Sequence, residues 1–484
     1  MDFKKSKRFL LTLGVLYWAL VLMIYVAAGD QFHHMLVTSD ALSSVSVIGE
    51  IEEGMQVKQR LVAPADQITS VDIQIATFGR TNIGVLNLQL ENEQGEEVAR
   101  GSTDISTFLE GQYNTIPIEQ AAKISRAEVL TLILTTEGTS VGNAVSVYYG
   151  NTVTAGRFDI VQDIAPEDMY AINGQTGAGR LCVRLNGIRT LSFYKTYWLI
   201  VISAFSILTI YTIRGYNLAR KGKNNGVVML CTLYTKYGFL LHQLVSRDFK
   251  TKYKRSVLGM AWSFLNPLLT MAVQYIVFST LFKTDIPNYP VYLLSGIVLF
   301  NFFNEAVSMG MTSITGNASL IKKVYMPKYI YPVSRACSSL INFVLALIPL
   351  FLVMVVTGTA FRPSLFLLVF DILCLLGFVI GMGLLMATAM TFFQDMQFLW
   401  GVLSMIWNYL TPVFYPESII SANFLTLYHM NPMYQYITFA RICIIDGVSP
   451  EPMAYLWCII SSVVVFLIGI LTFKKHQDKF VLYL

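Results

Sequence analysis

Long apolar runs without charge recur along this chain and predict membrane-spanning helices. The first run, 9–28, is 20 residues long. At 1.5 Å per residue, a helix of this length measures about 30 Å, the thickness of the hydrocarbon core of a bilayer. Four of the first eight residues are basic, which places the N-terminus in the cytosol by the positive-inside rule. We therefore expect residues 1–28 to form a cytosolic N-terminus and a first transmembrane helix.

The end of this run also has the small residues of a signal-peptide cleavage site, Val26-Ala27-Ala28. The apolar region of a signal peptide is about 7–15 residues long, so a run of 20 favours an uncleaved anchor. A second run, 196–213, is followed by Arg214 and further basic residues, which return the chain to the cytosol. We assign 193–214 to a second transmembrane helix, so residues 29–192 lie outside the cytosol.

Between these two spans the apolar positions change to a period of two. Apolar and polar residues alternate in 71–75, 86–90, 130–134, 145–149 and 181–185, and clusters of turn-forming residues separate these segments. Several short alternating strands with spaced turns are typical of a β-sandwich. We therefore expect residues 29–192 to form a β-sandwich domain of the jelly-roll kind.

After the second span, a basic stretch precedes further apolar runs. Residues 215–256 are expected to form a basic cytosolic linker that ends in an amphipathic helix, 238–254, in the membrane interface. Residues 257–484 add six apolar segments, giving about eight transmembrane helices with both termini in the cytosol. These six segments are 257–282, 291–314, 330–356, 365–393, 396–415 and 453–473. The proline-containing connection 417–452 fits short helices that dip back into the membrane against protein.

Composition and charge support this topology. Hydrophobic residues make up 54% of the chain and charged residues only 13%, against about 25% in soluble proteins. Residues 29–189 hold 20 acidic and 10 basic side chains, a net charge of −10, and the remaining 25 basic and 10 acidic side chains give +15. A nucleic-acid-binding protein would not divide its charge in this way. A multi-pass protein of the cytoplasmic membrane with an acidic outer domain would.

Several motifs of the second half occur in the order found in one family of membrane proteins. In chain order they are RDFKTKYKRSVLGMAW at 247–262, Asn266-Pro267, Asn317, LIKKV at 320–324, Pro327, TPVFY at 411–415, Asn431-Pro432 and Arg441. Together they resemble the motifs of ABC type-2 permeases that export cell-surface polysaccharides such as O-antigen and teichoic acid. The resemblance covers about 235–484 and implies a six-helix permease core.

The chain departs from the family pattern in two places. Gln394-Asp395 stands where the family often has Arg-Asp, so a positive charge is missing between the fourth and fifth core spans. The outer domain and its two spans precede the interfacial helix, where family members commonly begin.

The resemblance implies that a separate ABC ATPase subunit binds ATP and Mg²⁺. The chain contains no G-x-x-x-x-G-K-[ST] phosphate-binding loop. It also shows no motif for nucleophilic or metal catalysis, so we expect neither an enzyme nor a cofactor or metal site in this chain. A complete transporter would contain two copies of the permease about a symmetry axis. Its expected substrate is a lipid-linked glycan.

The loop after the second core span is the contact that the resemblance implies with the ATPase. A short basic helix with apolar residues can seat in a groove on a soluble partner. Attachment to anionic membrane lipids is the alternative, and it applies equally to the amphipathic helix. The predicted coupling residues are Asn317, Leu320, Ile321, Lys322, Lys323, Val324 and Pro327. The predicted residues of the interfacial helix are Arg247, Asp248, Lys250, Lys252, Tyr253 and Arg255.

A path for a hydrated glycan needs amphipathic walls, and aromatic side chains with a polar edge suit that purpose. The candidate lining residues are Gln274, Tyr275, Phe278, Trp407 and Tyr409. Packing inside the bundle is the alternative interpretation of these aromatic residues. Charged residues within spans cost about 2.5–3.5 kcal/mol each on insertion scales, so they default to a functional hypothesis. Glu305 and Asp371 are the candidates. Structural pairing, for which Arg335 is a candidate partner, is the alternative to a contact with the cargo.

The sequence leaves three functions open. The motifs favour an exporter of a lipid-linked polysaccharide, whose outer domain would receive the emerging glycan; that role rests on analogy between folds. An exporter of drugs or small lipids would share the permease fold. An envelope scaffold or sensor would use the spans as anchors only.

Overall fold

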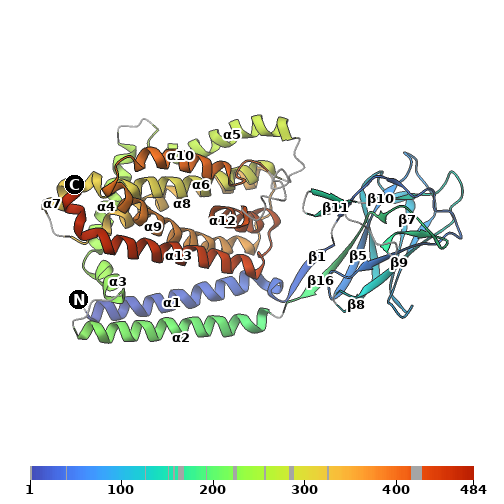
Figure 1. Ribbon diagram of the computed structural model, residues 1–484, viewed down its shortest axis with the longest axis horizontal. Helices are drawn as coiled ribbons and strands as arrows, with labels where there is room; N and C mark the ends of the chain where they lie inside the picture. The colour runs from blue at the N-terminus through green and yellow to red at the C-terminus, as the bar shows by residue number, and fades with distance from the viewer. Residues whose placement is uncertain are drawn as a thin grey trace. The chain divides into compact units, whose positions relative to one another are not determined.

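The chain folds into two compact units in the computed structural model (Figure 1). One unit comprises Met1–Gly29 and Lys195–Leu484 and is helical; the other, Asp30–Tyr194, is built from β-strands. The structure describes residues 3–39, 41–125, 127–150, 152–155, 158–161, 168–191, 193–221, 226–254, 258–282, 288–323, 326–415 and 428–484. Helices for the spans and strands for the inserted domain confirm the predicted fold class.

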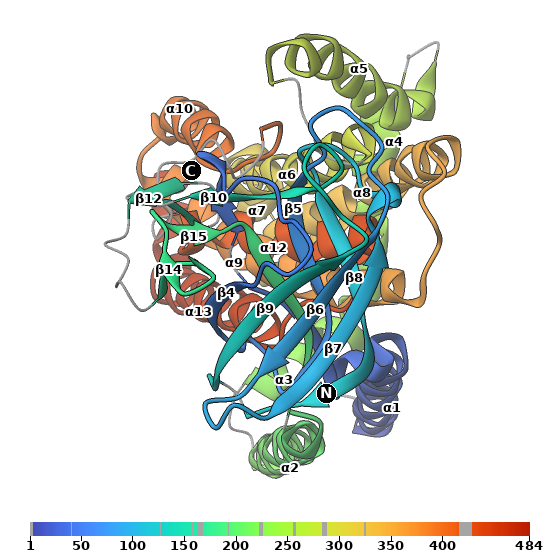
Figure 2. The same cartoon turned by 90° about the vertical axis from the view of Figure 1, so that its right-hand side faces the viewer.

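Two long helices frame the inserted domain in the sequence and run side by side in the helical unit (Figures 1 and 2). They are α1 (Phe3–Ala28) and α2 (Phe193–Arg220). The hydroxyl of Tyr17 on α1 donates to the Val201 carbonyl on α2 at 2.9 Å. The hydroxyl of Tyr197 on α2 donates to the Val21 carbonyl on α1, also at 2.9 Å. Each helix thus provides a backbone carbonyl that accepts a hydrogen bond from a tyrosine hydroxyl of the other helix, as expected for polar groups among apolar side chains.

The remaining helices form a bundle, preceded by a helix within the segment expected to be a cytosolic linker. This helix, α3 (Gly226–Thr235), is apolar, and its Tyr234 stacks on Phe9 of α1 with ring centroids 4.2 Å apart. The predicted amphipathic helix is α4 (Gly238–Tyr253). The bundle continues with α5 (Trp262–Phe282), α6 (Tyr289–Met311), α7 (Ala318–Lys323), α8 (Ile330–Val356), α9 (Leu368–Phe392), α10 (Met396–Tyr409), α12 (Pro432–Arg441), α13 (Pro452–His476) and α14 (Phe480–Tyr483).

Seven helices within the described ranges are long and apolar enough to cross a membrane: α1, α2, α5, α6, α8, α9 and α13. The predicted span 396–415 contains the shorter α10, 14 residues long, followed by the non-helical segment 410–415. Helix α6 lies at the centre of the bundle, whereas α5 is mostly exposed. The predicted re-entrant region contains α12, whose side chains are largely buried.

Glycines let the central helices approach closely. A Cβ atom added to Gly469 on α13 would lie 2.2 Å from the carbonyl oxygen of Gly381 on α9. Between α6 and α9, a Cβ on Gly310 would lie 3.0 Å from the Cα of Gly383. Small residues at helix crossings are a common way to pack helices within membranes.

The β unit contains two larger antiparallel sheets and one small one. Its strands are β1 (His34–Thr38), β2 (Ala41–Ser43), β3 (Ser46–Val47), β4 (Val57–Val62), β5 (Gln67–Ala76), β6 (Val85–Glu91), β7 (Glu97–Asp104), β8 (Tyr113–Lys123), β9 (Val129–Glu137), β10 (Ser146–Gly150), β11 (Thr152–Ala155), β12 (Phe158–Val161), β13 (Ala171–Ile172), β14 (Gln175–Thr176), β15 (Arg180–Leu181) and β16 (Val183–Thr190). The seven-stranded sheet has the order β1-β16-β5-β10-β15, with β8 beside β5 and β3 beside β10. The six-stranded sheet has the order β14-β13-β4-β9-β6-β7, and the small sheet is β12-β11-β2. Figure 2 shows β9, β6 and β7 running side by side.

The two larger sheets share one hydrophobic core. Ile73 and Ile75 of β5 contribute from the seven-stranded sheet, and Leu88 of β6 and Leu132 of β9 contribute from the six-stranded sheet. All four side chains are at most 1% exposed. This arrangement is a β-sandwich, because the apolar alternate positions of both sheets face a common interior.

Candidate functional site

A buried carboxylate joins three elements at one end of the helical unit. Asp248 on α4 is 7% exposed, and its Oδ1 accepts a hydrogen bond from the Nη2 atom of Arg247 at 3.0 Å. The Nη1 atom of Arg335 on α8 lies 3.2 Å from Asp248 Oδ2. Arg247 Nη2 also donates to the Oδ1 atom of Asn317 at 3.4 Å. Removing a carboxylate from water costs free energy, and ion pairs and hydrogen bonds with such partners are needed to offset that cost. We call Arg247, Asp248, Asn317 and Arg335 the charge cluster.

The predicted coupling segment begins at this cluster. Asn317 is 7% exposed, and its Nδ2 donates to the Ser313 carbonyl at 2.8 Å, which fixes the turn before α7. Leu320 and Ile321 are half-buried and pack against the chain's own core. The exposed side chains of α7 are Ser319, Lys322 and Lys323. The outward face of the coupling segment is therefore basic, and its apolar residues mainly anchor it to the bundle.

Four further predicted residues divide between the described and the undescribed parts of the chain. Val324 and Arg255 lie outside the described residues. Pro327 is half-buried before α8, and Lys250 is exposed on α4. The alternative of attachment to anionic lipid therefore stays open for the exposed bases.

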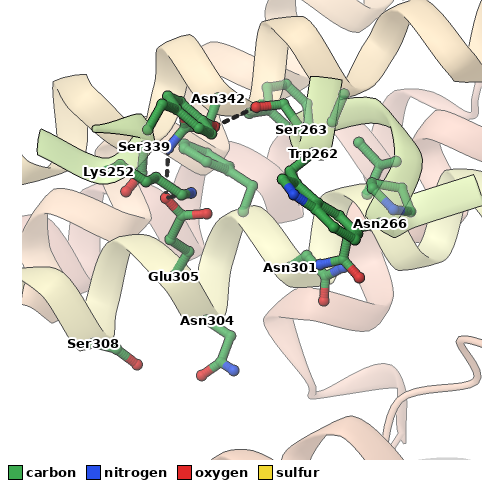
Figure 3. Close-up of a pocket in the computed structure, with 16 residues that line it drawn as sticks. Lys252, Trp262, Ser263, Asn266, Asn301, Asn304, Glu305, Ser308, Ser339 and Asn342 are labelled. Atoms are coloured by element: carbon green, nitrogen blue, oxygen red, sulfur yellow. Dashed lines mark hydrogen bonds and ion pairs between the residues drawn. The ribbon is translucent and has the colours of Figure 1, made fainter. Parts of the chain in front are cut away.

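A polar pocket of about 500 Å³ lies between α5, α6 and α8, and the end of α4 borders it (Figure 3). At its centre Glu305 Oε1 accepts hydrogen bonds from Lys252 Nζ at 2.8 Å and from Asn342 Nδ2 at 2.7 Å. The hydroxyl of Tyr253 donates to Asn342 Oδ1 at 3.1 Å and also contacts the hydroxyl of Ser263. Glu305, the predicted intramembrane charge, is thus paired with Lys252 of α4.

The pocket and the charge cluster are neighbours. A second cavity, of about 730 Å³, is lined by all four residues of the charge cluster and shares Lys252 and Glu305 with the polar pocket. Arg335, which the sequence suggested as a partner for Glu305 or Asp371, belongs to the charge cluster instead.

Asp371 occupies an apolar environment. The residue is 0% exposed in the first turn of α9, and the thiol of Cys458 on α13 lies 4.0 Å from its Oδ1. Its Oδ2 has no hydrogen-bond partner among the described residues. No group of three or more His, Cys, Asp or Glu side chains suited to a metal ion occurs in the described ranges. Nothing in this environment indicates a contact with substrate.

The TPVFY motif forms a non-helical segment whose carbonyls are bound by side chains. Arg441 donates from Nη1 to the Pro412 carbonyl and from Nη2 to the Val413 carbonyl, both at 2.7 Å. The hydroxyl of Tyr289 donates to the Phe414 carbonyl at 2.7 Å, and that of Tyr292 donates to the Tyr415 carbonyl at 3.0 Å. Four consecutive carbonyls are therefore satisfied without a helix, which irregular backbone among apolar helices requires.

Arg441 is held on its other side by an aromatic ring and a close glycine. Its guanidinium lies 3.4 Å from the centroid of the Tyr292 ring, a cation–π contact. A Cβ atom on Gly296 would lie 2.7 Å from Arg441 Nη2, so a larger residue there would displace the guanidinium. The TPVFY motif and the arginine of the NP…R motif thus form one structural element.

Asn431, the asparagine of the NP…R motif, completes this element. Its side chain caps α12 by accepting from the Met433 amide at 3.0 Å and also accepts from the Trp407 indole at 2.8 Å. Asn431 Nδ2 donates to the Thr411 hydroxyl at 2.8 Å. Asn431 therefore links α12, α10 and the TPVFY segment.

The predicted lining residues lie in different environments. Trp407 is half-buried and meets Phe303 edge to face at 5.0 Å, whereas Tyr409 is 58% exposed. Phe278 stacks on Phe414 with centroids 5.1 Å apart. Tyr275 is 41% exposed on α5, and Gln274 is half-buried nearby. Tyr275 and Tyr409 are therefore the members of the set with the most accessible rings, and a lining role stays a prediction for all five.

Comparison with known proteins identifies the helical unit. Residues 239–445 match the ABC-2 type transporter family. The chain is 31% identical over 252 residues to the O-antigen export system permease protein RfbA of Myxococcus xanthus, covering 51% of this chain and 95% of the relative. The chain belongs to the ABC-2 type transporter family. The resemblance deduced from the motifs is therefore confirmed.

Two further relatives of this ABC-2 protein carry related names. An RfbA permease of Klebsiella pneumoniae is 28% identical over 258 residues, which cover 51% of this chain and 98% of the relative. The polysialic acid transport protein KpsM of Escherichia coli is 21% identical over 240 residues, covering 49% of this chain and 92% of the relative. The family match begins at residue 239, so the β unit and α1 to α3 lie outside it. The ABC-2 protein is a multi-pass membrane protein with an additional domain.

Sequence reasoning missed the polar pocket of the ABC-2 unit. It named Glu305 and Lys252 separately and did not connect them. Asn301, Asn304 and Asn342 passed unnoticed, although amide side chains are costly in an apolar helix and can therefore signal a site. The pairing of Asp248 with Arg335 had no local signal, because it depends on how α4 packs against α8.

Proposed function

We propose that this protein is the membrane subunit of an ATP-driven exporter that moves a lipid-linked cell-surface polysaccharide across the cytoplasmic membrane. One observation carries the proposal: half of the chain aligns with nearly the full length of permeases named for O-antigen export. The polar pocket of the helical unit supports it, because a hydroxyl-rich substrate needs hydrogen-bonding groups within the membrane.

The proposal includes an ABC ATPase as the partner that supplies the energy, with ATP and Mg²⁺ bound by that partner. The basic outward face of α7, formed by Lys322 and Lys323, is the proposed docking surface. Movement of α7 would reach α8 through Asn317, Arg247, Asp248 and Arg335, since these residues form a continuous chain of polar contacts.

The proposed transporter contains two copies of the chain. The exposed apolar residues of α5 and α10 would face the second copy or lipid, and Tyr275 and Tyr409 are among them. The termini would be cytosolic and the β unit extracytoplasmic, as the distribution of basic residues indicates. We further propose that the β unit receives the emerging glycan.

Vesicle transport tests the proposed function. Purified full-length chain and its ATPase would be reconstituted with the lipid-linked glycan of the source cell. We expect ATP-dependent movement of the glycan, and an ATPase variant that cannot hydrolyse ATP should abolish it. Movement only of small lipids or dyes would contradict the proposal and indicate the drug-exporter alternative. Absence of any movement by an intact complex would indicate a scaffold.

The role of the β unit needs its own experiment. A chain in which residues 34–190 are replaced by a short Gly-Ser linker should still assemble with the ATPase. We expect it to export less glycan to the cell surface than the full chain at equal membrane amounts. Unchanged export would contradict a receiving role of the β unit while leaving the transport function intact.

A further inference from the structure

The polar pocket between α5, α6 and α8 has a chemistry of its own. Of the described residues that line it, Lys252 and Glu305 carry charge, and they form an ion pair with each other at 2.8 Å. The rest of its polar lining comes from amide and hydroxyl side chains and the indole of Trp262. These residues include Asn266, Asn301, Asn304, Asn342, Ser263 and Ser339.

This lining matches a sugar better than an anion. An amide side chain both donates and accepts hydrogen bonds, as a sugar hydroxyl does. An anion such as a phosphate needs donors and a net positive charge, and the acceptor oxygens of four asparagines disfavour it. Among the described lining residues the one cation is Lys252, and it is already neutralised by Glu305. Trp262, 46% exposed at the start of α5, offers an apolar ring face of the kind that packs against sugar rings.

The pocket also contains a polar atom that lacks a partner. Asn304 Oδ1 is buried and makes no hydrogen bond to any described residue. A buried amide oxygen without a partner costs about 1–3 kcal/mol, and because this oxygen is shielded from solvent it belongs to the packing behind the pocket wall. Figure 3 shows Asn301, Asn304 and Glu305 on the same helix, α6, with Glu305 turned toward Asn342 and Asn304 turned to the other side of the helix.

The pocket extends along a large part of the span. Trp262 is the first residue of α5, at the end of the unit that holds the charge cluster. Asn301 lies on α6, a helix of 23 residues that begins at Tyr289, and at 1.5 Å per residue it is about 18 Å from that start. The pocket therefore leads from one end of the bundle to about the middle of α6.

We propose that this pocket binds a sugar residue of the transported glycan, with Asn266 and Asn301 as hydrogen-bonding residues and Trp262 as the stacking surface. The inference rests on the proposed export function and specifies where the glycan is first held within the membrane. The ion pair of Lys252 with Glu305 and the Asn342 amide hold the wall of the site in place.

Complementation measures the effect on export. Cells that lack the chromosomal gene would express the full-length chain, and surface glycan and membrane-bound chain would both be quantified. We expect Asn266→Ala with Asn301→Ala to lower surface glycan about tenfold at equal chain amounts, since each lost hydrogen bond is worth a factor of about three. Asn217→Ala, which removes an exposed amide of α2 outside the pocket, is the matched control and should export normally. Normal export by the double variant would overturn the proposal.

Thiol protection measures occupancy without transport. An Asn301→Cys chain would be treated with a membrane-permeant maleimide in membranes from cells that make the lipid-linked glycan and from cells lacking its first glycosyltransferase. We expect labelling to fall several-fold only where the glycan is present, against the background of the unsubstituted chain. Equal labelling in both membranes would indicate water or phospholipid in the pocket and would overturn the proposal. Failure of the unsubstituted chain to restore surface glycan would instead overturn the export function itself.

Discussion

Asp248 on α4 and Arg335 on α8 form an ion pair, with Oδ2 and Nη1 3.2 Å apart. The Asp248 side chain is 4% exposed and that of Arg335 is 24% exposed, so the pair is largely shielded from solvent. Arg247 binds the other carboxylate oxygen and also reaches Asn317 before α7. The pair therefore connects α4, the predicted coupling segment before α7, and α8 of the bundle.

Removing one member of this pair should destabilise the helical unit. We expect Asp248→Asn to lower the free energy of unfolding by about 3 kcal/mol, because Arg335 keeps its charge without its partner. Thermal unfolding of the purified chain in detergent would measure it. In a double-mutant cycle, Asp248→Asn with Arg335→Gln should cost less than the sum of the single changes. Strict additivity would show that the two side chains do not interact.

Charge reversal on α7 should weaken the proposed contact with the ATPase. We expect Lys322→Glu together with Lys323→Glu to weaken binding of the ATPase about tenfold, since each exposed charge pair is worth up to about 1 kcal/mol. Affinity of the purified subunits at low salt would measure it, and the loss should shrink as salt rises. Lys58→Glu, an exposed lysine of β4, is the control and should bind as the unsubstituted chain does. Full affinity of the α7 variant would place the docking surface elsewhere.

Arg441 should not tolerate replacement by lysine. We expect Arg441→Lys to lower stability by about 3 kcal/mol or more, because a single ammonium cannot replace the fork that binds the Pro412 and Val413 carbonyls. Limited proteolysis and thermal unfolding would measure the change, with new cleavage expected near the TPVFY segment. Arg214→Lys on α2, where the side chain is exposed, should leave both measurements unaltered. If the Arg441→Lys chain resists proteolysis as well as the Arg214→Lys chain does, the carbonyl contacts of Arg441 are dispensable.

The β unit should lose stability in acid through Glu110. Hydrogen bonds from the Thr77 hydroxyl, and then from the Gly79 and Thr77 amides, hold the pKa of this carboxyl below its ordinary value of 4.5. A lowered pKa means that the stabilisation is present above the ordinary value and is lost as pH falls through the pKa of the folded state.

Hydrogen exchange of the β unit at several pH values would measure this effect in the full-length chain. We expect protection around Thr77 to fall below about pH 4.5, and Glu110→Gln to lower protection at neutral pH and reduce the acid dependence. Glu93→Gln in the turn after β6 is the control. An acid dependence that survives Glu110→Gln unaltered would assign it to other carboxyl groups.

Hydrophobic periodicity predicted most of the fold because burial sets it directly. Long apolar runs became α1, α2, α5, α6, α8, α9 and α13, and the alternating segments became strands of the sandwich. Helix α3 was missed because its ten residues are too few to indicate a span, and the helix is supported by packing on α1. The predicted span 396–415 ends early because its TPVFY carbonyls are bound by side chains from distant helices.

The candidate site was harder to predict than the fold. Motif order located Arg247, Asp248, Asn317 and Arg441, but their partners come from helices far along the chain. The pocket residues Asn301 and Asn342 lie 41 positions apart and meet only because α6 packs against α8. Tertiary contacts of this kind leave no periodic signal in a single sequence.

The strands that begin and end the inserted domain also explain how it can be carried by a transporter of this family. His34 on β1 is paired with Thr190 on β16, so the entrance and exit of the β unit lie one strand spacing apart, about 5 Å. A hairpin turn could bridge that gap between α1 and α2. The β unit is therefore inserted between α1 and α2 through two adjacent strands, and a different domain could be inserted at the same position without disturbing these two helices.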